Sequence, residues 1–236
     1  MKPNTLIVSE VFYSLQGEGS TVGVPAVFLR LSGCNLMCEG AGWRCDTIEV
    51  WQKGRSTEFE NVLSDYQFKA LKRGAHLIIT GGEPLLHEAA INRYLDWFIN
   101  KYEFLPFIEV ETNGTIIPGG SIINRVRMWN CSPKLPNSGE SFAKRVNEVA
   151  ILYIQDMTMD HIFKFVINKR GDLMDLFDDY KFIDFERKNK IYLMPAGATQ
   201  KELAVIRPIV AELCKDFGFN YTDRMHISIW NKKTGV

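Results

Sequence analysis

Residues 77–84, which read LIITGGEP, contain the clearest local indication of the fold class. Apolar and β-branched residues, typical of a buried strand, lead directly into two glycines, a glutamate and a proline, which are typical of a turn. A helical pattern over residues 86–101 follows. The stretch therefore predicts a strand–turn–helix unit of the kind that places successive strands parallel to one another.

The same unit recurs along the chain. A helix over residues 59–71 is expected to begin with a capping box formed by Thr57 and Glu60 and to end at Gly74. Six strands alternating with helices predict an α/β fold, either a partial open barrel or a flat doubly wound sheet, because a complete barrel needs eight units. The other expected strands cover residues 27–31, 107–112, 126–131, 162–167 and 191–195, and the other expected helices cover 142–154, 172–180 and 203–217.

Unusual residues follow the predicted strands at the ends where ligands bind in parallel sheets. Glycines, charged residues and amides are concentrated there, although the strands themselves are apolar. We therefore expect one site at the carboxyl edge of the sheet. The segments concerned are 32–34 (SGC), 80–84 (TGGEP), 111–114 (ETNG), 132–134 (SPK) and 194–197 (MPAG).

Composition excludes several classes of protein. The 236 residues include 28 Lys and Arg and 28 Asp and Glu, so the formal charge is zero. A chain without a cationic excess is a poor candidate for binding duplex DNA through many phosphates. The sequence contains no apolar run long enough for a membrane span, and its start lacks the pattern of a signal peptide, so a cytoplasmic protein with no membrane partner is expected.

Three of the five cysteines, Cys34, Cys38 and Cys45, fall on one loop. Three thiolates suit zinc, copper(I) or an iron–sulfur cluster. A structural zinc site would need a distant fourth ligand, whereas three cysteines can hold a four-iron cluster that leaves one iron open. Buried structural thiols are the remaining interpretation, and it is the one that we adopt for Cys131 and Cys214.

The order of these motifs resembles a known superfamily. The cysteine loop after the first predicted strand, with 80–84 (TGGEP) after the second, is similar to the radical S-adenosylmethionine (SAM) enzymes. Further segments resemble the 7-carboxy-7-deazaguanine synthase family, and the resemblance runs from about residue 8 to the end of the chain. These segments are 10–19 (EVFYSLQGEG), 23–36 (GVPAVFLRLSGCNL), 45–47 (CDT), 111–114 (ETNG), 132–134 (SPK) and 225–230 (MHISIW).

The resemblance implies a partial (β/α)6 barrel forming one domain over residues 1–236, with a substrate segment at 8–33 and a cluster loop at 34–47. It implies a lyase that converts 6-carboxy-5,6,7,8-tetrahydropterin to 7-carboxy-7-deazaguanine with loss of ammonia, for 7-deazaguanine pathways that modify tRNA or DNA. Implied cofactors are a [4Fe–4S] cluster, SAM and Mg2+. Implied partners are an electron donor such as flavodoxin and a second copy in a homodimer, with no direct contact to nucleic acid.

The resemblance also assigns roles to residues. Cys34, Cys38 and Cys45 are the expected cluster ligands, and Thr47 is the expected magnesium ligand. His226, on an expected late apolar strand, is either a substrate contact or an ordinary core histidine, and both interpretations stay open. Expected SAM contacts are Trp43, Gly81, Gly82, Glu83, Asn113, Ser132, Pro133 and Lys134; the other expected substrate contacts are Leu15, Gln16, Gly17, Glu18, Arg30 and Thr80.

The chain departs from the superfamily pattern in the cluster loop. Six residues separate Cys38 from Cys45 where two are usual, so residues 39–42 look like an insertion. Arg44 stands where an aromatic residue usually precedes the third cysteine, and Trp43 is the expected substitute. Another radical SAM enzyme, such as a glycyl-radical activase, and a non-enzymatic zinc-binding module are the alternatives.

Overall fold

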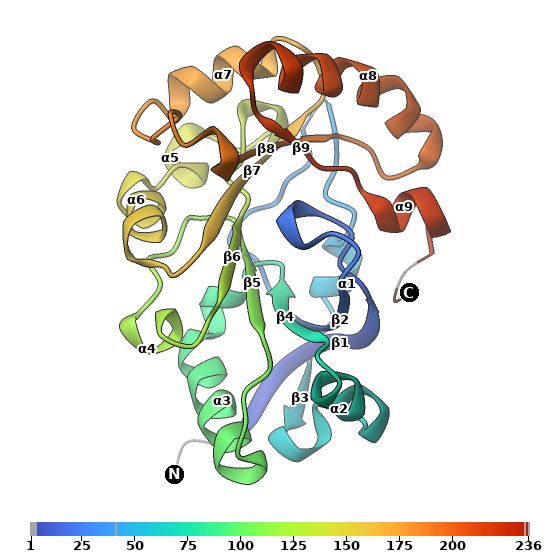
Figure 1. Ribbon diagram of the computed structural model, residues 1–236, viewed down its shortest axis with the longest axis vertical. Coiled ribbons are helices and arrows are strands. Elements are labelled where there is room, and N and C mark those ends of the chain that lie inside the picture. The colour runs from blue at the N-terminus through green and yellow to red at the C-terminus, as the bar shows by residue number, and fades with distance from the viewer. Residues whose placement is uncertain (1–3, 41, 234, 236) are drawn as a thin grey trace.

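The computed structural model describes residues 4–40, 42–233 and 235, and one curved sheet dominates this part of the chain (Figure 1). The sheet has nine strands in the order β3-β1-β2-β4-β5-β6-β7-β8-β9. From β2 onward all neighbours are parallel, whereas β1 pairs antiparallel with both β2 and β3. The strands are β1 Thr5–Leu15, β2 Pro25–Leu31, β3 Arg55–Glu58, β4 His76–Gly81, β5 Ile108–Thr112, β6 Met128–Cys131, β7 His161–Ile167, β8 Ile191–Pro195 and β9 Asn220–Tyr221.

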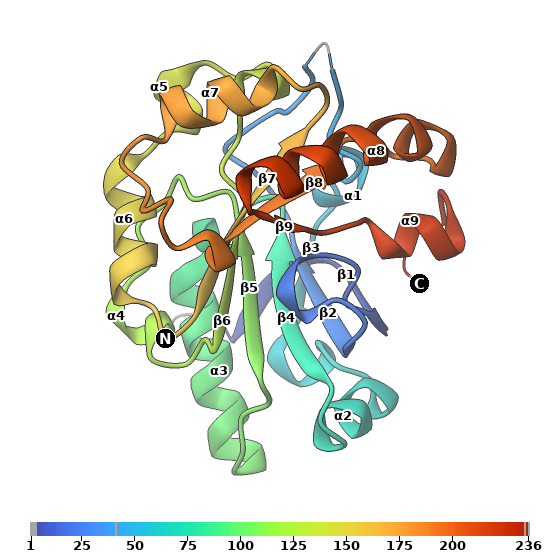
Figure 2. The same cartoon turned by 45° about the horizontal axis from the view of Figure 1, so that its top comes forward.

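Helices cover the outer face of the sheet (Figure 2). Strands β4 to β9 follow one another in chain order, and this decides between the two predicted architectures. A doubly wound sheet reverses its strand order at a switch point, and this sheet does not. The partial barrel is therefore confirmed. The helices are α1 Ile48–Trp51, α2 Asp65–Lys72, α3 Glu88–Tyr102, α4 Gly120–Ile123, α5 Phe142–Arg145, α6 Glu148–Met157, α7 Asp172–Asp179, α8 Gln200–Phe217 and α9 Met225–Trp230.

The two faces of the sheet differ in chemistry. Outward side chains such as Leu77, Val110 and Phe165 belong to the main apolar core beneath the helices. Because side chains alternate along a strand, the residues between them point to the inner face. There Glu111 and Lys164 face the hollow side of the barrel. A strand with one apolar and one polar face thus separates the core from a polar interior.

The start of α2 corrects a sequence prediction. The helix begins after Ser64, not after Thr57, because Ser64 forms a complete capping box with Gln67. Thr57 lies instead in β3, opposite Leu6 of β1. Phe59 is buried in the core within a short 3-10 turn, which explains why its apolar spacing resembles a helix.

Replacing Ser64 with alanine is expected to lower the free energy of unfolding by about 1 kcal/mol, because the amide of Gln67 loses its acceptor. Urea unfolding followed by circular dichroism measures the change. Thr57→Ala is the matched control and is expected to change stability by less than about 0.5 kcal/mol. If Thr57→Ala costs more than Ser64→Ala, the helix starts at the predicted position and not at the observed one.

Two other elements differ from expectation. The predicted helix over 142–154 is split into α5 and α6, because Val146 is extended and Asn147 caps the second helix by accepting a hydrogen bond from the Ala150 amide. The expected strand around His226 is helix α9, and that prediction is wrong. No helix within the described residues has both the length and the apolar character to cross a membrane.

Candidate functional site

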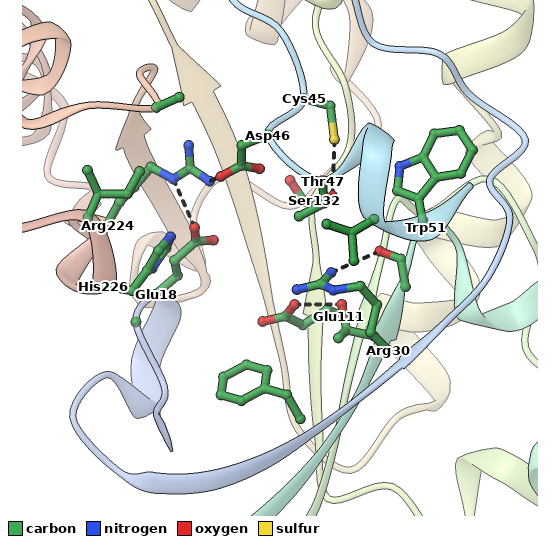
Figure 3. A pocket seen from close by; sticks show the side chains of 18 of the residues that line it. Glu18, Arg30, Cys45, Asp46, Thr47, Trp51, Glu111, Ser132, Arg224 and His226 are labelled. Atoms are coloured by element: carbon green, nitrogen blue, oxygen red, sulfur yellow. Dashed lines mark hydrogen bonds and ion pairs between the residues drawn. The ribbon is translucent and has the colours of Figure 1, made fainter. Parts of the chain in front are cut away.

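One pocket of about 580 Å³ opens at the carboxyl ends of the parallel strands (Figure 3). All of the site residues predicted from sequence line it, except Glu83 and Pro133. The cluster loop forms one part of its wall. The segment that follows β1 and the start of α9 form another, and polar side chains of β2 and of β4 to β7, together with Gln16, form the floor. The fold thus brings together residues that are more than 200 positions apart.

The three clustered thiols share one wall of this pocket. The Cys45 amide donates to the Cys38 carbonyl at 2.9 Å, which folds the loop back on itself. Burial raises the pKa of Cys38 to about 11, and the neighbouring Cys45 and Cys34 thiols contribute in the same direction. Gly82 packs so tightly on this loop that a Cβ there would lie 2.4 Å from the Cβ of Cys34.

This donor set fits an iron–sulfur cluster. Thiolates are the ligands that such clusters use, and three thiols in one pocket leave the fourth position to a cofactor. Among the described residues, no three His, Cys, Asp or Glu side chains converge as they would around a single metal ion. Sulfurs that bind three different irons of a cluster do not have to converge on one point.

The described residues of the cluster loop around the predicted insertion make local contacts of their own. Glu39 and Arg44 pair across it, and Gly40 packs so closely on Asn137 that a Cβ would lie 1.9 Å from the Asn137 carbonyl oxygen. Trp43 donates its indole N–H to the Asn137 side chain at 2.9 Å. Ala41 of the predicted insertion lies outside the described residues. The insertion therefore rests on the segment that follows β6.

Glu83 lies behind the pocket wall and not on it. Its carboxylate is fully buried and accepts hydrogen bonds from the amides of Leu85 at 3.0 Å and Asn113 at 2.7 Å, and from the Thr112 hydroxyl at 2.9 Å. Burial raises its pKa to about 7, although these donors oppose the shift. The arrangement holds Asn113, whose side-chain amide lies 3.9 Å from the sulfur of Cys34.

Hydrogen bonds to the backbone of Lys134 hold this residue in place. Its carbonyl oxygen accepts hydrogen bonds from Arg145 at 2.9 Å and from the Tyr180 hydroxyl at 2.7 Å. Its ammonium group reaches into the pocket and donates to Ser132 at 2.9 Å. The intervening Pro133 does not line the pocket. The SPK segment thus presents one cation and one hydroxyl.

The floor of the pocket carries a second set of polar groups. Arg30 pairs with Glu10 at 2.8 Å and donates to the Gly81 carbonyl at 3.3 Å. Thr80 donates to Glu111 at 2.9 Å, and the Gln16 side chain donates to the same carboxylate at 3.1 Å. An arginine, an amide and a carboxylate therefore stand side by side where a planar heterocycle with a carboxylate group would find complementary partners.

Glu18 is held between two cations. It pairs with Lys164 of β7 and with Arg224, whose Nε lies 3.0 Å from its carboxylate. Burial alone would raise the pKa of Glu18, but Lys164 and Arg224 hold it well below the usual range. His226 stands beside Glu18 (Figure 3) and packs on Gly17, where a Cβ would lie 2.3 Å from its Nδ1.

Sequence reasoning missed several pocket residues. Lys164 carried a usable signal, because it interrupts the otherwise apolar run of β7. Glu111 stood in a strand-end motif but received no role. Arg224 carried no local signal, because only its distant partners distinguish it from a surface arginine. Glu10 and Asp46 stood inside the motifs that carried the resemblance.

Known proteins resemble this chain over nearly its full length. A family model described as a 4Fe-4S single cluster domain matches residues 15–109. A 7-carboxy-7-deazaguanine synthase of Halobacterium salinarum is 34% identical over 96% of this chain and 91% of its own length. One of Rhodopirellula baltica is 30% identical over 99% of this chain and 90% of its own length.

Two solved structures share the fold. The crystal structure of QueE from Escherichia coli superimposes with a TM-score of 0.64 at 22% identity, covering 94% of this chain and 95% of its own. The structure of anSMEcpe with bound AdoMet has a TM-score of 0.52 at 16% identity, covering 82% of this chain and 62% of its own. Both likenesses support the same fold, a partial barrel.

Proposed function

Because the chain belongs to the 7-carboxy-7-deazaguanine synthase family, we propose that its pocket converts 6-carboxy-5,6,7,8-tetrahydropterin to 7-carboxy-7-deazaguanine with loss of ammonia. One observation carries the proposal. A wall with three thiols and a floor with Arg30, Gln16 and Glu111 meet in a single pocket. The first suits an iron–sulfur cluster, and the second suits a pterin that bears a carboxylate.

Cys34, Cys38 and Cys45 would hold the [4Fe–4S] cluster. The backbone of Gly81 and Gly82, with Ser132 and Lys134, would hold SAM beside it, because these groups line the pocket and offer carbonyls, a hydroxyl and one cation. When bound, the cluster and SAM supply the one-electron chemistry that removes a hydrogen from the substrate. The protein contributes placement and exclusion of water.

The polar groups on the pocket floor would bind and orient the pterin substrate. Glu10 holds the Arg30 guanidinium at the pocket floor, where it would pair with the substrate carboxylate. Gln16 and Glu111 offer an amide and a carboxylate to the donor and acceptor edge of the pterin. Leu15 and Gly17 would complete the substrate side of the pocket. Thr80 would support Glu111 through its hydrogen bond to that carboxylate.

Mg2+ would bind at Thr47. The Thr47 hydroxyl lines the pocket 3.3 Å from the sulfur of Cys45, so Thr47 would hold an ion next to the cluster loop. Magnesium prefers oxygen ligands and keeps several waters. One hydroxyl together with the substrate carboxylate is therefore a reasonable ligand set. Omitting Mg2+ should slow turnover of wild type more than that of Thr47→Val.

Anaerobic incubation of the cluster-loaded protein with SAM, a reductant, Mg2+ and 6-carboxytetrahydropterin tests the function. Mass spectrometry should detect 7-carboxy-7-deazaguanine. Cleavage of SAM without this product would retain the radical SAM class and refute the substrate, as expected for a glycyl-radical activase. A colourless protein that binds zinc and no iron would refute both.

The finer assignments rest on the family. We propose a homodimer that works in the cytoplasm, takes electrons from a small carrier such as flavodoxin, and delivers its product to tRNA or DNA modification without touching nucleic acid itself. Sedimentation of the loaded protein tests the dimer, and reduction by purified flavodoxin tests the donor.

A further inference from the structure

Arg224 touches three segments that are far apart in the sequence. Its Nε lies 3.0 Å from Glu18, its Nη2 lies 2.5 Å from Asp46, and its Nη1 donates to the Gly197 carbonyl at 2.6 Å (Figure 3). Glu18 lies in the substrate segment between β1 and β2, Asp46 lies in the cluster loop before α1, and Gly197 follows β8. One guanidinium therefore joins three parts of the pocket rim.

The charges of this network balance. Lys164 and Arg224 face Glu18 and Asp46, so two cations meet two carboxylates. Burial alone would raise the pKa of Asp46, but Arg224 lowers it below the usual value. Only 14% of the Arg224 side chain is exposed. A planar fork with several donors can serve three acceptors at once, which a lysine ammonium cannot do with the same geometry.

The position of Asp46 links the ion pairs of Arg224 to the cofactor side of the pocket. Asp46 lies between Cys45, an expected cluster ligand, and Thr47, the expected magnesium ligand. On the other side, the Met225 amide donates to the Gly17 carbonyl at 2.9 Å, so the start of α9 is attached to the substrate segment. A shift of Arg224 would move the cofactor wall and the substrate wall relative to each other.

We propose that Arg224 is a positioning residue that sets the distance between the cluster loop and the substrate segment, so that hydrogen transfer is coupled to SAM cleavage. The proposal rests on the proposed function. A misplacement on the order of 1 Å can cost about 100-fold in rate when the reacting atoms must be aligned. SAM would then still be cleaved, but less of the cleavage would lead to product.

Arg207 provides a matched control. This α8 residue pairs with Asp223 at 2.9 Å, directly before Arg224, and its guanidinium also contacts Ser228 of α9. It therefore holds the same helix without lining the pocket. Loss of Arg207 should lower the stability of α9 but leave the contacts of Arg224 with Glu18, Asp46 and Gly197 in place.

The experiment compares four single variants, Arg224→Ala, Arg224→Lys, Asp46→Asn and Arg207→Ala, with wild type. It also includes the double variant that combines Arg224→Ala with Asp46→Asn. Iron content, SAM affinity, the KM for the pterin and the ratio of product to 5′-deoxyadenosine are measured on the loaded enzymes. Hydrogen–deuterium exchange of the peptides around residues 15–19 and 45–50 is measured on the unloaded protein. Melting temperatures report stability.

Arg224→Ala should keep its iron and its SAM affinity, raise the KM for the pterin roughly 10-fold or more, and lower the product ratio roughly 10- to 100-fold. Exchange should rise in both peptides together. Asp46→Asn should share the effect, and the double variant should be no worse than Arg224→Ala alone, as expected for one network. Arg224→Lys should give a KM and a product ratio between those of wild type and Arg224→Ala. Arg207→Ala should lower the melting temperature only.

Equal losses of stability in Arg224→Ala and Arg207→Ala, with KM and product ratio unchanged, would overturn the proposal and leave Arg224 as a structural ion pair. If Arg224→Ala does not fold, the ratio of product to 5′-deoxyadenosine in Arg224→Lys and Asp46→Asn tests the proposal instead. If wild type itself makes no product, the proposed function fails, whereas coupled exchange in the two peptides still tests the link made by Arg224.

Discussion

Cys45→Ala is expected to abolish cluster binding and all formation of product. Cys45 is one of three thiols on the pocket wall, and its backbone already closes the loop onto Cys38. A four-iron cluster held by only two protein ligands would have two irons without a protein ligand and would be lost to solvent thiols or oxygen. Iron analysis, the visible absorption of the reconstituted protein and SAM cleavage measure the effect.

Cys214→Ala is the matched control for this variant. Cys214 is buried on α8, away from the pocket, and its thiol faces the Asn220 carbonyl at 3.3 Å. Its replacement should lower stability slightly and leave four irons and full SAM cleavage. A Cys45→Ala protein that retained four irons and cleaved SAM would contradict the assignment of the ligand.

Arg30→Ala is expected to lower kcat/KM for the pterin roughly 10- to 100-fold, because a charge-assisted pair with the substrate carboxylate contributes about 1.5–3 kcal/mol. Arg30 faces the pocket floor from β2 and is held by Glu10 at 2.8 Å. SAM binding should persist, because the groups expected to hold SAM lie on other strands. Titration of SAM and of substrate into the loaded protein separates the two affinities.

Glu10→Gln distinguishes the two possible roles of Arg30. If Arg30 serves the substrate, removal of its internal partner leaves the guanidinium charged, and pterin binding should be retained or strengthened. If Arg30 only balances Glu10 within the fold, both variants should lose stability alike and should lose SAM and pterin affinity together. That second pattern would refute the role in substrate binding.

The pocket separates its tasks by charge. Its cofactor side presents thiols and the cation of Lys134, while the substrate side is a balanced set of internal ion pairs around Glu18. Such pairs add little net charge to the protein, and their geometry depends on each partner being present. We infer that the zero formal charge of the chain conceals a strongly polar interior.

The residue pattern was enough to predict the repeating strand–turn–helix unit and the polar chemistry at the strand ends. The six central strands were predictable because each is a short apolar run bounded by turn residues. Such patterns depend only on neighbouring residues. The clustered cysteines were predictable for the same reason. Local pattern also misled, since Phe59 has helical spacing within a turn and the apolar run at His226 belongs to α9.

Which polar residues contact one another could be learned from the folded structure but not from the residue pattern. The register of β1 shifts between Val8 and Glu10, and this places Glu10 opposite Arg30. Arg224 and Glu18 are separated by 206 positions, and Lys164 and Glu18 by 146. The energy of an ion pair depends on distance in space and on burial, and neither quantity is encoded in the residues next to a charge. The fold alone brings these charges together into one site.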